Sequence, residues 1–315
     1  MKKLILSLIL LLAQQFSNAA ERDSLINPFA KFIYDCDACG CSASGGGMGF
    51  SSMINQNFVG LRYFYQSYSS RDGIFVNSPW IDENFNTLQI WGRIPISKKL
   101  QLTVLVPYHF HNRELSDGEQ KINGLGDITV LAMYTAFRTN HNDSVAYRHT
   151  LQIGGGFKSP TGKYSMSSNE GSVNPSFQVG TGSWDYLLAT EYVINHKNWG
   201  LNTMLNYVFK TENKKEYQFG NQFNYASTLF YVIEREKYTF VPQIGAAGEV
   251  YESNYQHGQK LPETAGNILF GKIGLEAGYE KFSAGMNVML PINQNLTGGN
   301  VEANYRWSVN FNYSL

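Results

Sequence analysis

Hydrophobic and polar residues alternate strictly over the last fourteen residues of the chain, 302–315. Every second position is aromatic or aliphatic, and polar residues stand between them. The apolar positions are Tyr305, Trp307, Val309, Phe311, Tyr313 and Leu315. A period of two predicts a β-strand with one apolar and one polar face. A strand with one face in lipid and the other in a watery lumen has this pattern. We therefore predict that it closes a transmembrane barrel against the first strand.

The same alternation recurs in further segments from Phe58 onward. In the first of them Val59 and Leu61 are predicted to face lipid, whereas Arg62 and Gln66 face inward. About ten residues cross a ~25 Å apolar band at ~40° tilt, and most segments supply that length. The sequence therefore predicts an all-β fold, a transmembrane antiparallel up-and-down β-barrel of about twelve strands. The strands are predicted at 58–66, 88–94, 100–110, 128–134, 151–157, 184–194, 199–210, 223–231, 238–244, 269–279, 282–290 and 302–315.

The connections between these segments alternate in length. Short ones fall at Ser97–Lys99, Asn195–Asn198, Glu234–Lys237 and Glu280–Lys281, and long ones at Ser69–Asn84, His111–Asn123, Thr161–Ser183 and Tyr251–Thr264. Outer-membrane barrels have short periplasmic turns and longer external loops, so we expect both termini in the periplasm. Outward aromatic residues gather beside the short turns, where they predict an interfacial girdle. They are Tyr192, Trp199, Tyr231, Tyr238, Tyr279, Phe282 and Tyr313.

The first 57 residues differ from the alternating part. Lys2 and Lys3 precede an apolar run, Leu4–Leu12, and small residues follow near Ala20, which together predict a secretory signal peptide at 1–20. Residues 21–57 are rich in Cys and Gly, and we expect them in the periplasm or as a plug in the barrel mouth. The barrel itself is predicted at 58–315.

Composition supports a membrane barrel rather than a soluble domain. Charged residues make up 16 % of the chain, below the ~25 % that is typical of soluble proteins. The chain has 20 Tyr, 20 Phe and 5 Trp, which suits outward faces in contact with outer-membrane lipid. Its formal charge is zero, from 25 basic and 25 acidic residues. It therefore lacks the basic surface of a nucleic-acid-binding protein.

Two motifs carry a resemblance to a known family. Gly124-Leu-Gly-Asp127-Ile is followed, after a strand and a turn, by Gly154-Gly-Gly-Phe-Lys158-Ser-Pro160-Thr-Gly162-Lys. Together they resemble the outer-membrane family described as "MetA-pathway of phenol degradation". The resemblance covers Phe58 to the C-terminus and implies a barrel that passes small, often hydrophobic solutes. The aromatic last strand also resembles the signal read by the barrel-insertion machinery, although Leu315 stands where that signal usually has Phe.

Charged residues of both signs are predicted on the inward face. The lumen candidates are Arg62, Arg93, His109, Asp127, Lys158, Asp185, Glu191, Lys210, Glu249, Lys272, Glu276 and Arg306. One interpretation is a charged constriction that selects permeants. The other is a set of mutually paired charges that fills a narrow lumen.

Two other classes of function are alternatives to a transporter. A hydrolase at the external rim needs a base beside a nucleophile, and His109, His111 and Ser159 are the candidates. No local motif connects these three residues, so we predict no catalytic residues and no enzyme. A structural or adhesion barrel that transports nothing is the remaining alternative.

Three cysteines stand close together in the N-terminal segment, at Cys36, Cys39 and Cys41. Three thiolates suit Cu(I) or another soft metal ion. The oxidising periplasm instead favours one disulfide and an odd thiol, with Cys36 as the less strained partner. Both interpretations stay open, and no other cofactor is predicted.

Overall fold

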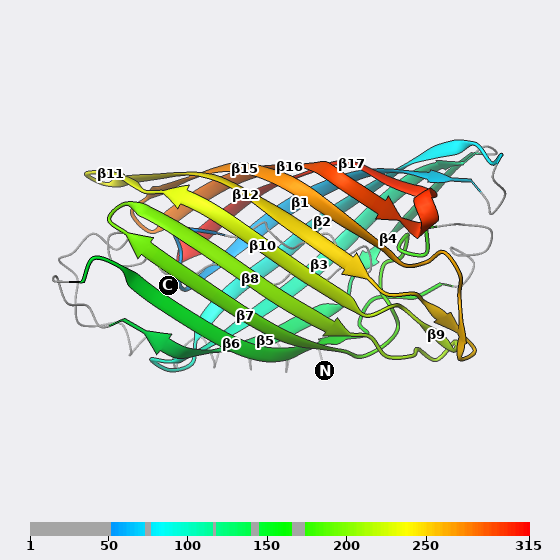
Figure 1. The fold of residues 1–315 in the computed structure, drawn as a ribbon, viewed down its shortest axis with the longest axis horizontal. Helices are drawn as coiled ribbons and strands as arrows, with labels where there is room; N and C mark the ends of the chain where they lie inside the picture. The colour runs from blue at the N-terminus through cyan, green and yellow to red at the C-terminus, as the bar shows by residue number, and fades with distance from the viewer. Residues whose placement is uncertain (1–51, 73–76, 116–117, 140–144, 166–173) are drawn as a thin grey trace, which may run out of the picture.

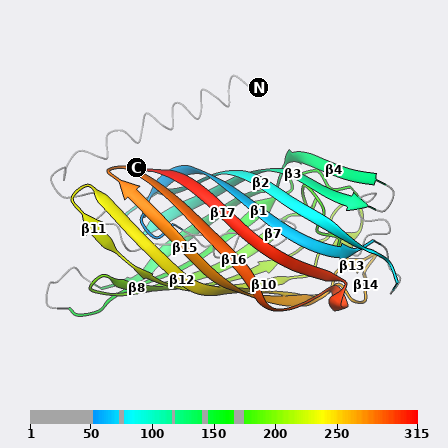
Figure 2. The same ribbon diagram turned by 90° about the horizontal axis from the view of Figure 1, so that it is seen from above.

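The protein forms a closed barrel of twelve antiparallel strands that are steeply tilted from its long axis (Figures 1 and 2). The computed structural model describes residues 52–72, 77–115, 118–139, 145–165 and 174–315. Within these ranges, no helix is long and apolar enough to cross a membrane. The strands of the barrel are β1 (Phe58–Arg71), β2 (Trp80–Pro95), β3 (Leu100–Leu115), β4 (Gly118–Leu125), β5 (Ile128–Arg138), β6 (Arg148–Ser159), β7 (Asp185–His196), β8 (Trp199–Phe209), β10 (Gln222–Tyr231), β11 (Ile233–Arg235), β12 (Tyr238–Tyr251), β15 (Gly266–Tyr279), β16 (Phe282–Leu296) and β17 (Val301–Ser314).

The last strand closes the barrel against the first, as its alternation predicts. β17 pairs with β1 from Phe58↔Ser314 to Ser70↔Val301, and every other strand pairs with its neighbours in the chain. β4 and β5 count as one of the twelve strands, because both pair with β3. β10 and β11 likewise count as one, because both pair with β12. Closure leaves no long unpaired edge in the membrane, which a sheet in lipid requires.

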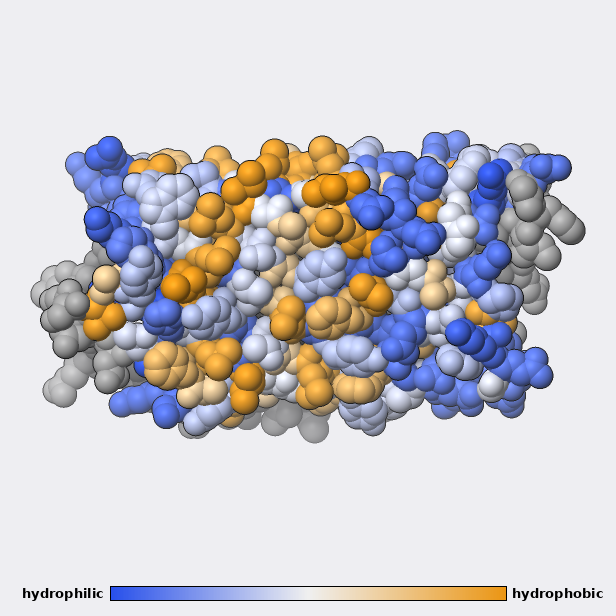
Figure 3. All heavy atoms as spheres, viewed as in Figure 1, coloured by the Kyte–Doolittle hydropathy of each residue, from blue (hydrophilic) through white to orange (hydrophobic). Residues whose placement is uncertain are grey.

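The predicted faces are confirmed by burial. Leu61 on β1 is 50 % exposed on the outer surface, whereas the neighbouring Arg62 is 2 % exposed inside the barrel. Apolar residues gather in a broad band over the outer surface, and hydrophilic residues cover the end that carries the long loops (Figure 3). This band is the surface that lipid covers, because only a lipid-facing sheet stabilises so many exposed apolar side chains.

Two predicted loops are largely strand. Residues 111–115 belong to β3 and residues 118–123 to β4, which pairs with it, and residues 80–84 belong to β2. The outward side chains Glu119, Lys121 and Asn123 of β4 are exposed and polar, and the only apolar member of this face is Leu125 at the end of the strand. These strand ends rise beyond the apolar band, so a search for apolar periodicity misses them.

The long loops at that end carry a second, small sheet. It consists of β9 (Tyr217–Gln218), β13 (Tyr255–Gln256) and β14 (Gln259–Lys260), and a 3-10 turn, η3 (Thr297–Gly299), connects β16 to β17. We call this the loop end of the barrel. The opposite end, where short turns such as Glu280–Lys281 and the last strand's C-terminus lie, is the turn end. The turn end is predicted to face the periplasm.

Aromatic side chains form a row at the turn end, as predicted. Tyr238, Tyr279, Phe282 and Tyr313 are direct register neighbours on β12, β15, β16 and β17. Their rings contact one another in two pairs, with centroids 4.9 Å apart for Tyr238 and Tyr279 and 5.3 Å for Phe282 and Tyr313. Amphipathic rings at one level indicate a headgroup interface.

Candidate functional site

The candidate site is the interior of the barrel. The twelve residues predicted to face the lumen are all buried: Arg62, Arg93, His109, Asp127, Lys158, Asp185, Glu191, Lys210, Glu249, Lys272, Glu276 and Arg306. Their burial agrees with inward orientation. Whether any of them selects a permeant stays a prediction.

One group of these charges forms a ladder across β5 to β8 near the loop end. Lys158 Nζ lies 2.7 Å from Asp185 Oδ2, and Lys210 Nζ lies 3.1 Å from the same oxygen. Lys158 also approaches Asp127 Oδ2 at 3.3 Å. Register explains the ladder, because Lys158 and Asp185 are direct partners on β6 and β7. The alternating signs neutralise one another.

A second group ties β17 to β12. Arg306 donates to both carboxylate oxygens of Glu249, at 2.7 Å from Nη1 and 3.1 Å from Nη2, and it also bonds the Tyr68 hydroxyl. Its guanidinium carbon lies 4.2 Å from the centroid of the Phe270 ring. These groups agree with the interpretation in which inward charges pair with one another. A bidentate, fully buried pair fixes geometry more than it creates a net field.

The inward face is more apolar than the sequence pattern predicts. Phe85, Trp91, Leu131, Phe230 and Phe270 all lie inside the barrel and are buried. A signal for this was present in the sequence: Val130-Leu131-Ala132-Met133 is continuously apolar, so both faces of β5 are apolar there. The lumen is therefore mixed, with charged pairs among aromatic and aliphatic side chains.

A bulge at Gly126–Asp127 turns one acid into the lumen. Tyr108 pairs with Leu125 and Leu105 with Thr129, so the chain from β4 to β5 has one residue more than β3 opposite. Bulges of this kind re-aim side chains. A β-carbon at Gly126 would lie 2.3 Å from His109 Nε2, which explains the need for glycine. The Gly-Asp motif thus places the Asp127 carboxylate inside the barrel (5 % exposed).

A stretch of the loop between β6 and β7 lies inside the barrel, and we call residues Asn174–Ser183 the infolded segment. Thr181 donates from its backbone N–H and its hydroxyl to Asp127 Oδ2, both at 2.8 Å. Asp127 Oδ1 accepts the N–H of Gly162 at 2.9 Å. Sequence reasoning missed this segment, because its two apolar residues, Phe177 and Val179, show no periodicity in a polar loop.

At the turn end, the residues just before β1 also lie inside the barrel. Ser52 Oγ donates to Glu276 Oε1 at 2.5 Å, and the N–H of Met53 donates to Glu276 Oε2 at 2.6 Å. Met53 and Ile54 are buried. Residues 52–55 therefore partly fill the turn-end mouth, and whether 21–57 forms a plug stays a prediction, because residues 21–51 lie outside the described ranges.

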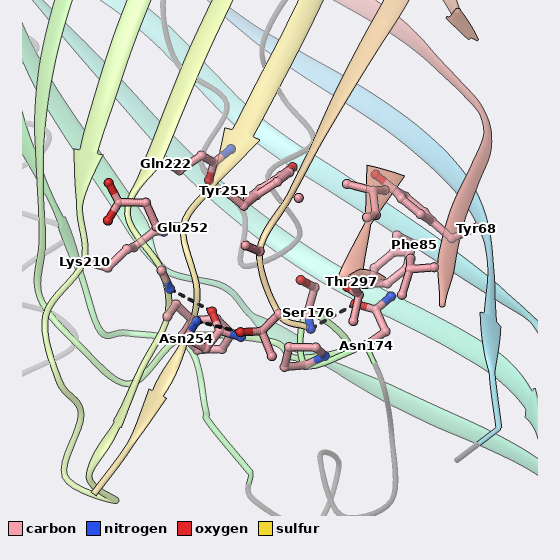
Figure 4. A pocket seen from close by; sticks show the side chains of 18 residues that line it. Tyr68, Phe85, Asn174, Ser176, Lys210, Gln222, Tyr251, Glu252, Asn254 and Thr297 are labelled. Carbon is pink, nitrogen blue, oxygen red and sulfur yellow. Dashed lines mark hydrogen bonds between the residues drawn. The ribbon is translucent and has the colours of Figure 1, made fainter. Parts of the chain in front are cut away.

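A cavity of about 70 Å³ remains at the loop end. The infolded segment contributes Asn174 and Ser176 to one side of it. Residues from β1, β2, β10 and β12, among them Tyr68, Phe85 and Tyr251, complete the wall (Figure 4). Its lining joins aromatic rings to amide and hydroxyl groups.

Ser159, the candidate nucleophile of a hydrolase, does not lie beside the candidate bases His109 and His111. His109 and His111 do point inward, and His109 Nδ1 lies 2.8 Å from Thr87 Oγ1. Ser159 does not sit across from them, because it follows the inward Lys158 on β6 and so belongs to the outer face. Its hydroxyl donates to the carbonyl of Ile128 at 3.3 Å. The structure therefore does not form the predicted Ser–His arrangement.

The metal prediction falls on residues outside the described ranges. Cys36, Cys39 and Cys41 belong to 1–51, so copper binding and disulfide formation both stay predictions. Over the part of the chain that the structure describes, no group of three His, Cys, Asp or Glu side chains could hold a metal ion.

The closed barrel, its apolar outer band and its aromatic row define an outer-membrane β-barrel protein. The family described as "Putative MetA-pathway of phenol degradation" matches residues 85–314, and the chain belongs to this family.

Several solved structures match the chain, the first of them with the same fold. An outer membrane channel from Pseudomonas putida F1 has a TM-score of 0.60 at 15 % identity, over 85 % of this chain and 98 % of that chain. The β domain of the Bordetella autotransporter BrkA has a TM-score of 0.48 at 11 % identity, over 82 % and 99 %. The NanC porin has a TM-score of 0.41 at 10 % identity, over 81 % and 100 %. No curated protein sequence matches the chain.

Proposed function

We propose that the protein is a channel through which small solutes cross the outer membrane by passive diffusion. The likeness in fold to the Pseudomonas putida channel and the phenol-degradation description of the family support this proposal. The loop-end cavity carries it, because it lies inside the barrel beside the external loops. Passive diffusion requires no catalytic group in the barrel wall. It requires a path through the barrel and lining side chains that the solute can pass.

The lining favours small, uncharged solutes that combine an aromatic or apolar body with a hydrogen-bonding group. Tyr68, Phe85 and Tyr251 offer ring faces, and Asn174 and Ser176 offer amide and hydroxyl groups. Aromatic pairs prefer stacked or edge-on contacts, so a ring-bearing solute gains contacts that a polyol does not. Several charges on the inward face meet charges of opposite sign, such as Lys158 with Asp185 and Arg306 with Glu249, which lowers the net field that could select ions.

The solute class is tested by current interruption in planar bilayers. We expect phenol, added at millimolar concentration, to reduce the ion current through the inserted protein reversibly, whereas glycerol at the same concentration does not. Ser176→Leu reduces the cavity without filling it and is the matched control. Phenol should leave the current of that variant unchanged, which separates occupation of the cavity from effects on the bilayer. Equal responses to phenol and glycerol would exclude this solute class.

A further inference from the structure

We infer that the infolded segment, Asn174–Ser183, is the constriction of the channel, and that Asp127 and Glu83 anchor it there. This inference rests on the proposed function. It assigns a role to the Gly-Asp motif of the bulge, which the barrel wall alone does not require.

The contacts of the segment reach nearly across the lumen. At one end Asn174 Nδ2 donates to Glu83 Oε2 on β2 at 2.5 Å. At the other end Asn213 Nδ2, just beyond β8, donates to the carbonyl oxygen of Thr181 at 2.9 Å. β2 and β8 stand five places apart in the ring of twelve strands. A segment held at both places therefore crosses the barrel close to its diameter.

Between these ends the segment packs on inward side chains. The Phe177 ring lies 5.8 Å from that of Phe85 on β2, and the Arg113 guanidinium carbon on β3 lies 4.5 Å from its centroid. Phe177 is completely buried. Val179 lies against β4, where its Cγ1 comes within 3.4 Å of the position of a β-carbon built on Gly124. The segment thus fills the side of the lumen that β2 to β8 enclose.

The loop-end cavity is the space that the segment leaves on the other side. Besides Tyr68 and Phe85 on β1 and β2, its lining comes from β10, β12, β15, β16 and β17 and the loops beside them, and it meets the segment at Asn174–Ser176 (Figure 4). A solute that uses this cavity therefore passes directly beside the segment. Displacing the infolded segment would widen the path beside it. The contacts that hold the segment in place therefore set the width of the channel at this point.

Two carboxylates supply the anchoring contacts. Asp127 accepts two hydrogen bonds from Thr181 and lies 3.3 Å from Lys158 Nζ, which itself donates to Thr181 Oγ1 at 3.1 Å. Glu83 accepts from Asn174 while it pairs with Arg113 at 3.3 Å. Hydrogen bonds to ionised groups are the stronger class. Each carboxylate is already held by a cation of the wall, so each is fixed in place to receive the segment.

Thiol accessibility tests the anchoring without depending on transport. Val179→Cys is introduced with Cys36, Cys39 and Cys41 changed to Ser, and the folded barrel in detergent is labelled with a small maleimide. We expect Asp127→Asn and Asn174→Ala each to raise the labelling rate about tenfold or more, because each removes charge-assisted hydrogen bonds. Asn174→Ala alters only the segment, so it keeps the test valid if Asp127→Asn disturbs folding. Glu191→Gln removes an equally buried carboxylate, which accepts a hydrogen bond from Asn202 on β8 at 2.7 Å, and should leave the labelling rate unchanged.

Conductance of the same variants tests the constriction. Asp127→Asn and Asn174→Ala should raise single-channel conductance about twofold or more, since the narrowest point limits the current. Equal labelling of all variants would overturn the anchoring. Raised labelling with unchanged conductance would overturn the constriction. A silent bilayer with every variant, the unmodified protein included, would contradict the proposed function, whereas the labelling rates would still decide the anchoring.

Discussion

Replacing Arg306 with methionine is expected to lower the free energy of unfolding by about 3–5 kcal/mol, because it leaves the buried Glu249 without its cation. Both side chains are almost fully buried, and the pair is bidentate. Arg306 also packs on the Phe270 ring and bonds the Tyr68 hydroxyl, so the substitution removes contacts to three strands at once. Denaturant unfolding of the protein in detergent micelles, followed by tryptophan fluorescence, measures the change.

The loss of stability in Arg306→Met should come from the Glu249 carboxylate, which stays buried without a partner of opposite charge. Adding Glu249→Gln to Arg306→Met should recover much of the stability, since the double variant buries no unpaired charge. Lys121→Met breaks the exposed pair between Lys121 and Glu119 at 2.8 Å and should cost less than about 1 kcal/mol. Similar losses for Arg306→Met and Lys121→Met would show that burial of the pair has no energetic consequence.

Arginine at Ile273 is expected to destabilise the inserted barrel by about 2–4 kcal/mol, because this position faces the middle of the membrane. Ile273 is 61 % exposed on the outer face of β15, beside Ile244 on β12 and Val288 on β16. Burying a guanidinium in hydrocarbon there costs free energy that an aqueous surface does not. The measurement is denaturant unfolding in lipid vesicles.

Val250→Arg is the matched control for this prediction. Val250 is also exposed on the outer face, but it lies near the loop end of β12, where its register neighbour is Asn267. Charges near the interface cost only about 0–1 kcal/mol. If arginine were tolerated equally at both positions, the outer surface would face water rather than lipid.

The strands could be predicted because lipid imposes one rule on all of them. Side chains that face lipid are apolar, so Leu61, Ile90 and Ile273 mark their strands in the sequence although they are exposed on the outer surface. Closure followed from the same rule, since the last strand is as apolar on one face as the first. The rule stops where the strands leave the apolar band, and the hairpin of β3 and β4 was therefore predicted as a loop.

The interior could be predicted only in part, because its contacts join residues far apart in the sequence. Inward positions followed from phase, and Lys158 and Asp185 were found on neighbouring strands. Their pairing depends on register, which alternation does not specify. The infolded segment depends on Thr181 reaching Asp127, 54 residues away in the chain. The loop sequence has no periodicity that predicts this contact. Only the structure therefore shows that Asp127 of the Gly-Asp motif binds the infolded segment.

Single-channel recording of the purified protein in planar bilayers is the most direct test of the central claim, that this outer-membrane barrel is a channel. Insertion is verified in parallel by the slower gel mobility of the heated protein relative to the unheated, folded form. We predict discrete, reproducible current steps at each insertion event, which disappear when the protein is unfolded by heat before addition. A bilayer that stays silent although folded protein has inserted would contradict the claim and favour a structural or adhesion barrel.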